Sequence, residues 1–250
     1  MAALARVVAA EALDLLPPAS RAARRSRHDL RRVHLAMGSR GIVVRGWQSL
    51  VGAGRAAGPL RILELGAGDG SLLLGVARAL APAWPQVQLT LLDRHAVVSA
   101  ATLAAYARLG WQVQLEVADV LDWAAHAGGS AGHAPQARHA RWDLVTTTLF
   151  LHHFQGPQLA AVLAAAAQRA DRFFACEPRR HGLTLAASHL VGALGAGAVT
   201  RQDAVLSVRA GFRARELSAA WPGGRRTWST HEYAAGLFSH CFSAHRSGAT

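Results

Sequence analysis

Three glycines alternate with other residues in the run 64–70, which reads Glu-Leu-Gly-Ala-Gly-Asp-Gly. The run follows the apolar stretch 61–63 and leads into residues 71–80, so its order is strand, glycine-rich turn, helix. Such a turn needs backbone angles that glycine adopts without strain, and it lets a ligand approach the backbone closely. At the end of a parallel strand, a turn of this kind is where doubly wound α/β folds bind nucleotides.

Two aspartates follow the next two predicted strands. Asp93 comes directly after strand 87–92, 23 residues after Gly70. A carboxylate there can accept hydrogen bonds from both ribose hydroxyls of a nucleotide. Asp93 can also cap the helix predicted over 95–109, and the two roles can coexist. Asp119 follows strand 112–117 and offers a second carboxylate to the same ligand.

The elements that must position these residues alternate as a βαβ pattern does, which predicts an α/β fold with a doubly wound, mostly parallel sheet of seven strands. The predicted strands are 61–65, 87–92, 112–117, 142–148, 172–177, 213–219 and 237–245. The predicted helices are 4–16, 28–50, 71–81, 95–109, 157–170, a segment from 182 to about 194, and one that Thr200 and Asp203 open as a capping box.

We expect one compact domain in which residues 1–58 form a helical lid and residues 59–250 form the ligand-binding part. Nothing in the sequence is apolar over about 18 residues without charge, so no membrane span is predicted. The N-terminus lacks the layout of a signal peptide. Only Cys176 and Cys241 occur, which favours a reducing, cytoplasmic location over a disulfide framework. Neither the cysteines nor the irregularly spaced histidines of loop 126–140 predict a metal site.

The net charge of +12 raises the possibility of a nucleic-acid partner. The chain has no lysine and no asparagine, and its basic residues are all arginine. This bias is typical of a GC-rich genome, so the charge alone is weak evidence. Arginines are densest over residues 21–32, where they can form a solvated helix face, a lid that attracts an anionic substrate, or an RNA-binding surface.

The glycine run departs from the dinucleotide fingerprint G-x-G-x-x-G, which would require glycine where Ser71 stands. Its spacing, acidic-x-G-x-G-x-G, resembles motif I of the class I S-adenosylmethionine (SAM)-dependent methyltransferases. The segment 142–154 (WDLVTTTLFLHHF) resembles motif IV of the small-molecule members of that family. Together with Asp93 and Asp119, the resemblance covers residues 60–178, about half of the chain.

This resemblance implies SAM as the cofactor. In the family, the acidic residue at the position of Asp119, with its neighbour Val120, faces the adenine, and Thr147 or Thr148 lies near the methionine moiety. The implied cofactor-binding residues are Glu64, Gly66, Ala67, Gly68, Gly70, Asp93, Arg94, Asp119, Val120 and Thr147.

Methyl transfer to most acceptors requires a base beyond the carboxyl edge of the sheet, and His152 and His153 are expected there. Glu177 ends the neighbouring fifth strand, so it can raise the basicity of His152 and fix its tautomer. The arrangement looks like the His–Glu pair of polyketide C-methyltransferase domains, which favours His152, after Leu151, over His153. Alternatively, His152 only packs over the cofactor and Glu177 only caps the segment that follows.

We therefore predict methyl transfer from SAM to an oxygen or an activated carbon of a small aromatic, quinone or polyketide-derived acceptor. Nucleobase chemistry is not supported, because the chain lacks the Asn/Asp-Pro-Pro motif after strand four and a cysteine in the usual context. An RNA methyltransferase that uses the arginine-rich N-terminus remains an alternative, as does a SAM-binding protein without catalysis. An NAD-dependent enzyme is the weakest alternative. The oligomeric state is not predicted.

Overall fold

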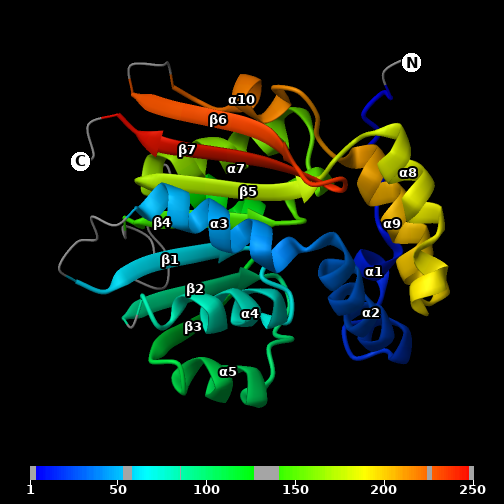
Figure 1. Ribbon diagram of the computed structural model, residues 1–250, viewed down its shortest axis with the longest axis horizontal. Coiled ribbons are helices and arrows are strands. Elements are labelled where there is room, and N and C mark those ends of the chain that lie inside the picture. Colours follow the sequence, from blue (N-terminus) through cyan, green and yellow to red (C-terminus); the bar gives the residue numbers. More distant parts are fainter. Residues whose placement is uncertain (1–3, 53–57, 85, 127–140, 224–226, 248–250) are drawn as a thin grey trace.

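Seven strands form one mixed sheet in a computed structural model that describes residues 4–52, 58–84, 86–126, 141–223 and 227–247 (Figure 1). The strand order is β3-β2-β1-β4-β5-β7-β6, in which β7 runs antiparallel to both of its neighbours and the other pairs are parallel. The strands are β1 (Leu60–Leu65), β2 (Val87–Asp93), β3 (Trp111–Val117), β4 (Leu144–Thr148), β5 (Arg172–Pro178), β6 (Trp228–Ala235) and β7 (Ser239–Arg246). The predicted α/β class and seven-stranded, mostly parallel sheet are confirmed.

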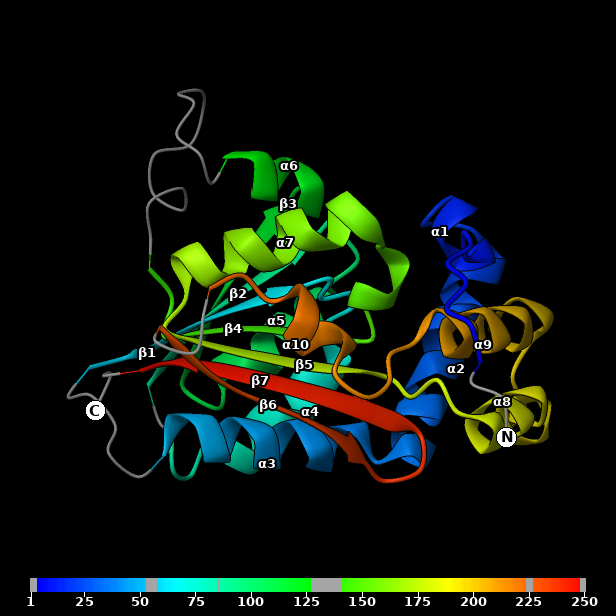
Figure 2. The same cartoon turned by 90° about the horizontal axis from the view of Figure 1, so that it is seen from above.

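Helices cover both faces of this sheet, and a further group lies beside its edge. The helical elements are α1 (Ala12–Leu15), α2 (Arg21–Met37), α3 (Ser39–Val51), α4 (Ser71–Leu80), α5 (Ala100–Ala107), α6 (Val120–Ala125), the 3-10 turn η2 (Leu151–His153), α7 (Gly156–Arg169), α8 (Gly182–His189), the 3-10 turn η3 (Val191–Leu194), α9 (Ala198–Ala210) and α10 (Glu216–Ala220). Figure 2 shows α3 and α4 on one face and α6, α7 and α10 on the other. In Figure 1, α1, α2, α8 and α9 gather beyond the carboxyl ends of the parallel strands.

The central strands are buried on both faces because the crossover helices cover them. All five residues of β4 are buried, as are six of the seven in β5. Strands in this environment read as nearly continuous apolar runs, which is why the sequence locates them well. Two apolar cores result, one between the sheet and α3, α4 and α5, and one between the sheet and α6, α7 and α10.

Helix α3 packs directly on the sheet, and it does so closely at Gly46. A Cβ at this glycine would lie 2.2 Å from a ring carbon of Phe174 on β5. The indole of Trp47 is fully buried, and its Nε1 donates a hydrogen bond to Thr146 Oγ1 on β4. Gly46 is therefore required by packing.

We expect Gly46→Ala to lower the free energy of unfolding by about 1–3 kcal/mol, because the added methyl group overpacks the interface with Phe174. Gly41→Ala is the matched control on the same helix, since its Cβ would meet only the flexible guanidinium of Arg45, at 3.3 Å. That change should stabilise the protein by up to about 1 kcal/mol through helix propensity. Urea unfolding of both variants tests the pair, and equal stabilities would contradict the packing argument.

The N-terminal helices differ from the sequence-based prediction. The prediction of a helix over 4–16 is wrong except at α1, because residues 4–11 are held extended by tertiary hydrogen bonds such as Arg6 Nε to the carbonyl of Ala210 (2.7 Å). The predicted helix 28–50 is instead two helices. Ser20 caps α2, and Gly38, with φ of 66°, ends α2 and opens α3.

Four further predicted elements need correction. Residues 213–219 are not a strand, because α10 lies there and the carboxylate of Glu232 on β6 accepts hydrogen bonds from its Leu217 and Ser218 amides. Thr200 and Asp203 do not open a helix, since α9 begins at Ala198. Helix 95–109 shortens to α5 behind the capping Ser99, and segment 182–194 divides into α8 and η3.

The remaining expectations concern the domain division, the loop 126–140, membrane spans and the two cysteines. The division at residue 58 remains a prediction, although α3 packs on the sheet while α1 and α2 lie at its edge. Of the predicted loop 126–140, residues 127–140 lie outside the described part of the chain. Within the described residues, no helix has the length and apolar character needed to cross a membrane. Cys176 and Cys241 are buried free thiols in register on β5 and β7.

Candidate active site

A cavity of about 870 Å³ opens at the carboxyl edge of the parallel strands. Its floor is formed by the turns that follow β1, β2, β3 and β4, and its other walls come from the segment around α1 and from α2, α8 and α9. Eight of the residues implied to bind a cofactor line it: Glu64, Gly66, Ala67, Gly68, Asp93, Arg94, Asp119 and Val120. The structure thus brings together residues that are far apart in the sequence.

The glycine turn has the geometry that its sequence predicts. Gly66, Gly68 and Gly70 have φ angles of 74°, 55° and 70°, which L side chains rarely adopt. A Cβ at Gly66 would also lie 2.3 Å from the ring of Phe150, the residue before η2. Gly70 is set back from the cavity as the N-cap of α4, and its carbonyl accepts a hydrogen bond from Tyr106 Oη (2.8 Å).

Glu64 places a buried carboxylate on the cavity wall. Its Oε2 atom has no hydrogen-bond partner, and the side chain belongs to β1, directly before the glycine turn. Burial, and secondarily the nearby charge of Asp93, raise the pKa of Glu64 well above its usual range. A buried acceptor without a partner is costly, so this atom points to a ligand with a donor or a positive charge.

Asp93 and Asp119 are already partly used by the protein. Asp93 Oδ2 accepts a hydrogen bond from the Gly68 amide (2.8 Å), and its Oδ1 accepts one from the His95 amide (2.9 Å). Asp119 Oδ1 caps α6 through the Leu121 amide (2.7 Å). A carboxylate has about four acceptor positions, so each can also accept hydrogen bonds from a ligand. Asp93 does not cap a helix as predicted, because Ser99 is the N-cap of α5, but its bonds to the two amides leave it able to bind a ligand.

Two implied cofactor residues lie differently from the expectation. Thr147 is buried within β4 and does not line the cavity, whereas Thr148 does, with an Oγ1 that has no partner. Arg94 reaches the cavity, but its Nη2 donates to the carbonyl and the Oδ1 of Asp14 (2.8 and 2.9 Å). It ties the turn after β2 to the N-terminal segment.

The structure brings His152 and Glu177 into direct contact. His152 Nδ1 lies 2.8 Å from Glu177 Oε2, and their side chains are 3% and 0% exposed. Burial alone would lower the pKa of His152, but hydrogen bonds with Glu11 and Glu177 outweigh it and raise the pKa to about 9. Because Glu177 can only accept, Nδ1 carries a proton and Nε2 is the titrating atom.

Glu177 also positions the whole of η2. Its Oε1 accepts hydrogen bonds from the amides of Phe150 (3.1 Å) and Leu151 (2.9 Å), and its Oε2 from the amide of His152 (3.3 Å). Leu149 before them has φ of 54°, a left-handed conformation that costs about 1–2 kcal/mol. One carboxylate thus holds both the imidazole and η2. Glu177 does not cap the segment that follows it, because His181 is the N-cap of α8.

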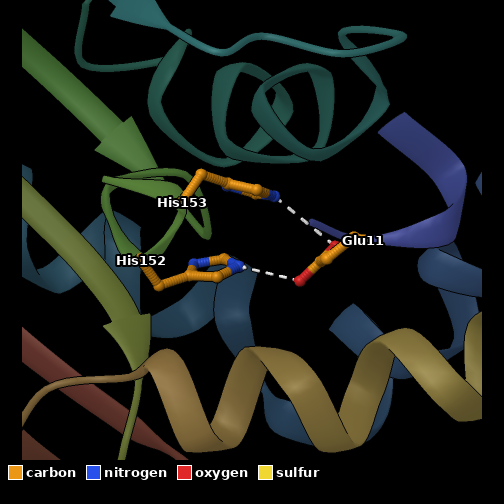
Figure 3. A group of neighbouring side chains, drawn as sticks. All are labelled: Glu11, His152 and His153. Carbon is orange, nitrogen blue, oxygen red and sulfur yellow. Dashed lines mark hydrogen bonds and ion pairs between the residues drawn. The ribbon is translucent and has the colours of Figure 1, made fainter. Parts of the chain in front are cut away.

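Glu11 is the site residue that sequence reasoning missed. It lies just before α1, and its carboxylate reaches both histidines: Oε1 is 3.3 Å from His152 Nε2 and Oε2 is 3.5 Å from His153 Nε2 (Figure 3). Ser207 on α9 donates a hydrogen bond to the same Oε1. The sequence gives little signal for it, because Glu11 is one of three charged residues, with Arg6 and Asp14, in a mostly apolar N-terminal segment.

Comparisons with known proteins agree with this fold. In sequence, the chain matches no family model and no curated protein. In structure, it is similar to an O-methyltransferase family protein from Burkholderia thailandensis, with 16% identity and a TM-score of 0.59 over 93% of this chain and 62% of that one. The chain thus spans less than two thirds of that protein's length.

Two further solved structures are similar to this chain, with comparable sequence identities and somewhat lower TM-scores. One is the small RNA methyltransferase HEN1, with 14% identity and a TM-score of 0.51 over 83% of this chain and 26% of that one. The other is a protein associated with the conversion of a disulfide bond into a thioacetal group during echinomycin biosynthesis. It has 17% identity and a TM-score of 0.50 over 77% of this chain and 78% of that one. The fold is therefore that of the class I methyltransferases, as the motifs predicted.

Proposed function

We propose that the chain is a SAM-dependent methyltransferase that acts on an oxygen or an activated carbon of a small aromatic, quinone or polyketide-derived acceptor. One observation carries this proposal: a single cavity has the glycine turn with Glu64 on one wall and His152, held from behind by the buried Glu177, on another. A turn of the nucleotide-binding kind and a candidate general base thus line the same cavity. A SAM-binding protein without chemistry has no use for such a base.

The residues on the first wall fit SAM. The partnerless Oε2 of Glu64 suits the positive charge of an amino-acid ammonium group, and the carboxylate of Asp93 suits ribose hydroxyls. Asp119 and Val120 are at the position that faces adenine in the family. When bound, SAM would supply an electrophilic methyl group.

His152 is proposed to take the proton that the acceptor loses. Glu177 holds the imidazole with Nδ1 protonated, so that Nε2 presents its lone pair toward the cavity in the neutral ring. Glu177 then stabilises the imidazolium that forms, while its bonds to the η2 backbone hold the ring in place. Glu11 must move or share the site when an acceptor binds, because it contacts Nε2.

A small acceptor is favoured over RNA by the walls of the cavity. Apolar side chains from α1, α2, α9 and η3 line it: Leu13, Leu30, Val33, Met37, Val191 and Val208. Several α2 arginines that suggested an RNA surface are paired within the protein. Arg31 bonds Asp69 of the glycine turn (2.8 Å), and Arg25 and Arg32 flank the buried Asp29 (3.9 and 3.6 Å).

Transfer of label from methyl-labelled SAM to a panel of acceptors tests this proposal. We expect product with phenols, quinols or 1,3-dicarbonyl compounds and none with ribosomal or transfer RNA. Labelled RNA, with an affinity that falls steeply with salt, would favour the RNA alternative instead. Calorimetry should show binding of S-adenosylhomocysteine and not of NADH, and the reverse result would contradict the cofactor assignment.

A further inference from the structure

The two neighbouring histidines of η2 hold the same tautomer. His152 Nδ1 donates to Glu177, and His153 Nδ1 lies 2.9 Å from the carbonyl oxygen of Phe150, which can only accept. In each neutral ring the Nε2 atom therefore carries a lone pair. Both Nε2 atoms point at the carboxylate of Glu11, as Figure 3 shows. If both rings are neutral, these lone pairs face those of the carboxylate, so a positive charge is needed between them.

A proton on each ring or one metal ion can supply that charge, and the distances separate the two. The contacts from Glu11 to His152 and His153 are 3.3 and 3.5 Å, whereas a charge-assisted N–H···O bond is about 2.7–2.9 Å. His152 makes a contact of that normal length with Glu177, at 2.8 Å. Two ligands bound at about 2.0–2.1 Å to a tetrahedral ion are about 3.3–3.4 Å apart. The two distances from the Glu11 carboxylate match this spacing, and the three ligand atoms all lie within 4.8 Å of one another.

We propose that Glu11, His152 and His153 bind one divalent cation, Zn²⁺ in the first place, which fastens the N-terminal segment to η2. Two imidazoles and a carboxylate are a donor set that suits zinc and neighbouring transition metals and leaves a fourth position open. The surrounding groups support each ligand as they do in metal sites. Glu177 and the Phe150 carbonyl orient the rings, and Ser207 bonds the carboxylate.

The ligand from the N-terminal segment is held in place on both sides. Before it, Arg6 Nη2 donates to the carbonyl of Phe154, 2.8 Å away. After it, the Asp203 carboxylate accepts hydrogen bonds from the Ala12 and Leu13 amides (2.7 and 3.0 Å). Asp14 Oδ2, 3.4 Å from His153 Nε2, adds negative charge beside the site, but Arg94 pairs with it. Glu11 and Glu177 therefore provide the charges that offset the cation.

Occupation of this site has a consequence that rests on the proposed function. The cation and the acceptor's proton compete for the same Nε2 lone pair of His152, so bound Zn²⁺ should inhibit methyl transfer. Binding itself depends on neither SAM nor acceptor. A zinc titration without substrates therefore tests the site separately from the reaction.

The experiment uses the chain of residues 1–250, freed of metal with a chelator that is then removed. We expect one Zn²⁺ per chain by calorimetry, with Kd of about 1 µM or lower, and a Co²⁺ derivative with the intense visible absorption of tetrahedral coordination. Glu11→Gln and His153→Asn should each weaken Zn²⁺ binding at least 30-fold. His245→Asn, which alters an exposed histidine on β7, should leave it unchanged.

Several outcomes overturn the proposal. The first is that Zn²⁺ does not bind more tightly than about 100 µM. The second is that Glu11→Gln and His153→Asn bind Zn²⁺ with the same affinity as the unaltered protein. Circular dichroism of both variants shows whether weaker Zn²⁺ binding comes from the missing side chain or from loss of the fold. Because Glu11 and His153 lie on two different segments, one variant that remains folded is enough to test the site. If Zn²⁺ binds as described but does not inhibit, the cation site stands and the assignment of His152 as the base fails.

Discussion

Replacement of His152 by asparagine is expected to lower kcat for methyl transfer by about 10²–10⁴-fold, the usual contribution of a general base. Asparagine keeps a donor for Glu177 but removes the Nε2 lone pair, so η2 should hold its place. Affinity for S-adenosylhomocysteine should stay within about twofold, because its proposed binding residues lie on the other wall of the cavity. Steady-state kinetics and calorimetry on one preparation measure both quantities.

His245→Asn serves as the control, because it makes the same chemical change on an exposed part of β7. A His152→Asn enzyme with kcat within threefold of the unaltered protein would refute the role of His152 as base. Glu177→Gln is a poorer probe, since three backbone amides point at this carboxylate. The amide nitrogen of glutamine would face one of them, so its loss of activity would also report displacement of η2.

The sheet and the glycine turn could be predicted from the sequence because their signals are local. Buried parallel strands are continuous apolar runs, and the turn after β1 needs positive φ angles at Gly66, Gly68 and Gly70. Asp93 and Asp119 then follow from the length of one strand and one helix. Each of these inferences depends on residues within about 25 positions of one another.

The N-terminal segment could not be predicted in this way. Residues 4–11 have a composition that favours a helix, but the Val7 amide donates to the carbonyl of Arg209 on α9, and the Arg6 side chain bonds the carbonyl of Ala210. The spacing of Thr200 and Asp203 predicts a local capping box, whereas the Asp203 carboxylate accepts hydrogen bonds from the amides of Ala12 and Leu13, about 190 residues away. Glu11 is 141 positions from His152. Tertiary contacts of this range leave no periodicity in a single sequence.

The prediction of a strand over 213–219 is wrong for a related reason. Residues 213–219 alternate enough to suggest a strand, but Ala214 has φ of 53° and Glu232 caps the helix that follows it. The capping carboxylate belongs to β6, which was not predicted as a strand. Helix α10 and strand β6 are held together by this tertiary contact, so no local sequence pattern identifies either of them.

The second large effect is expected at Gly66, where the cofactor turn touches the segment that carries the histidines. Gly66→Ala should lower the free energy of unfolding by about 3 kcal/mol or more, from about 1–2 kcal/mol for a left-handed alanine and about 1–3 kcal/mol for overpacking. The overpacking arises because the new Cβ would lie 2.3 Å from the ring of Phe150. Urea unfolding measures the change.

Gly68→Ala is the matched control, because it has the same sign of φ (55°) but no atom within 4 Å of its Cβ. It should cost only about 1–2 kcal/mol, the left-handed contribution. The difference between the two variants isolates the contact with Phe150, and a Gly66→Ala/Phe150→Ala double variant should be less destabilised than the sum of its single changes. Equal losses in Gly66→Ala and Gly68→Ala would show that the turn and η2 are not coupled. If the coupling holds, Gly66→Ala should also reduce methyl transfer, because Phe150 is bonded to the same Glu177 that orients His152.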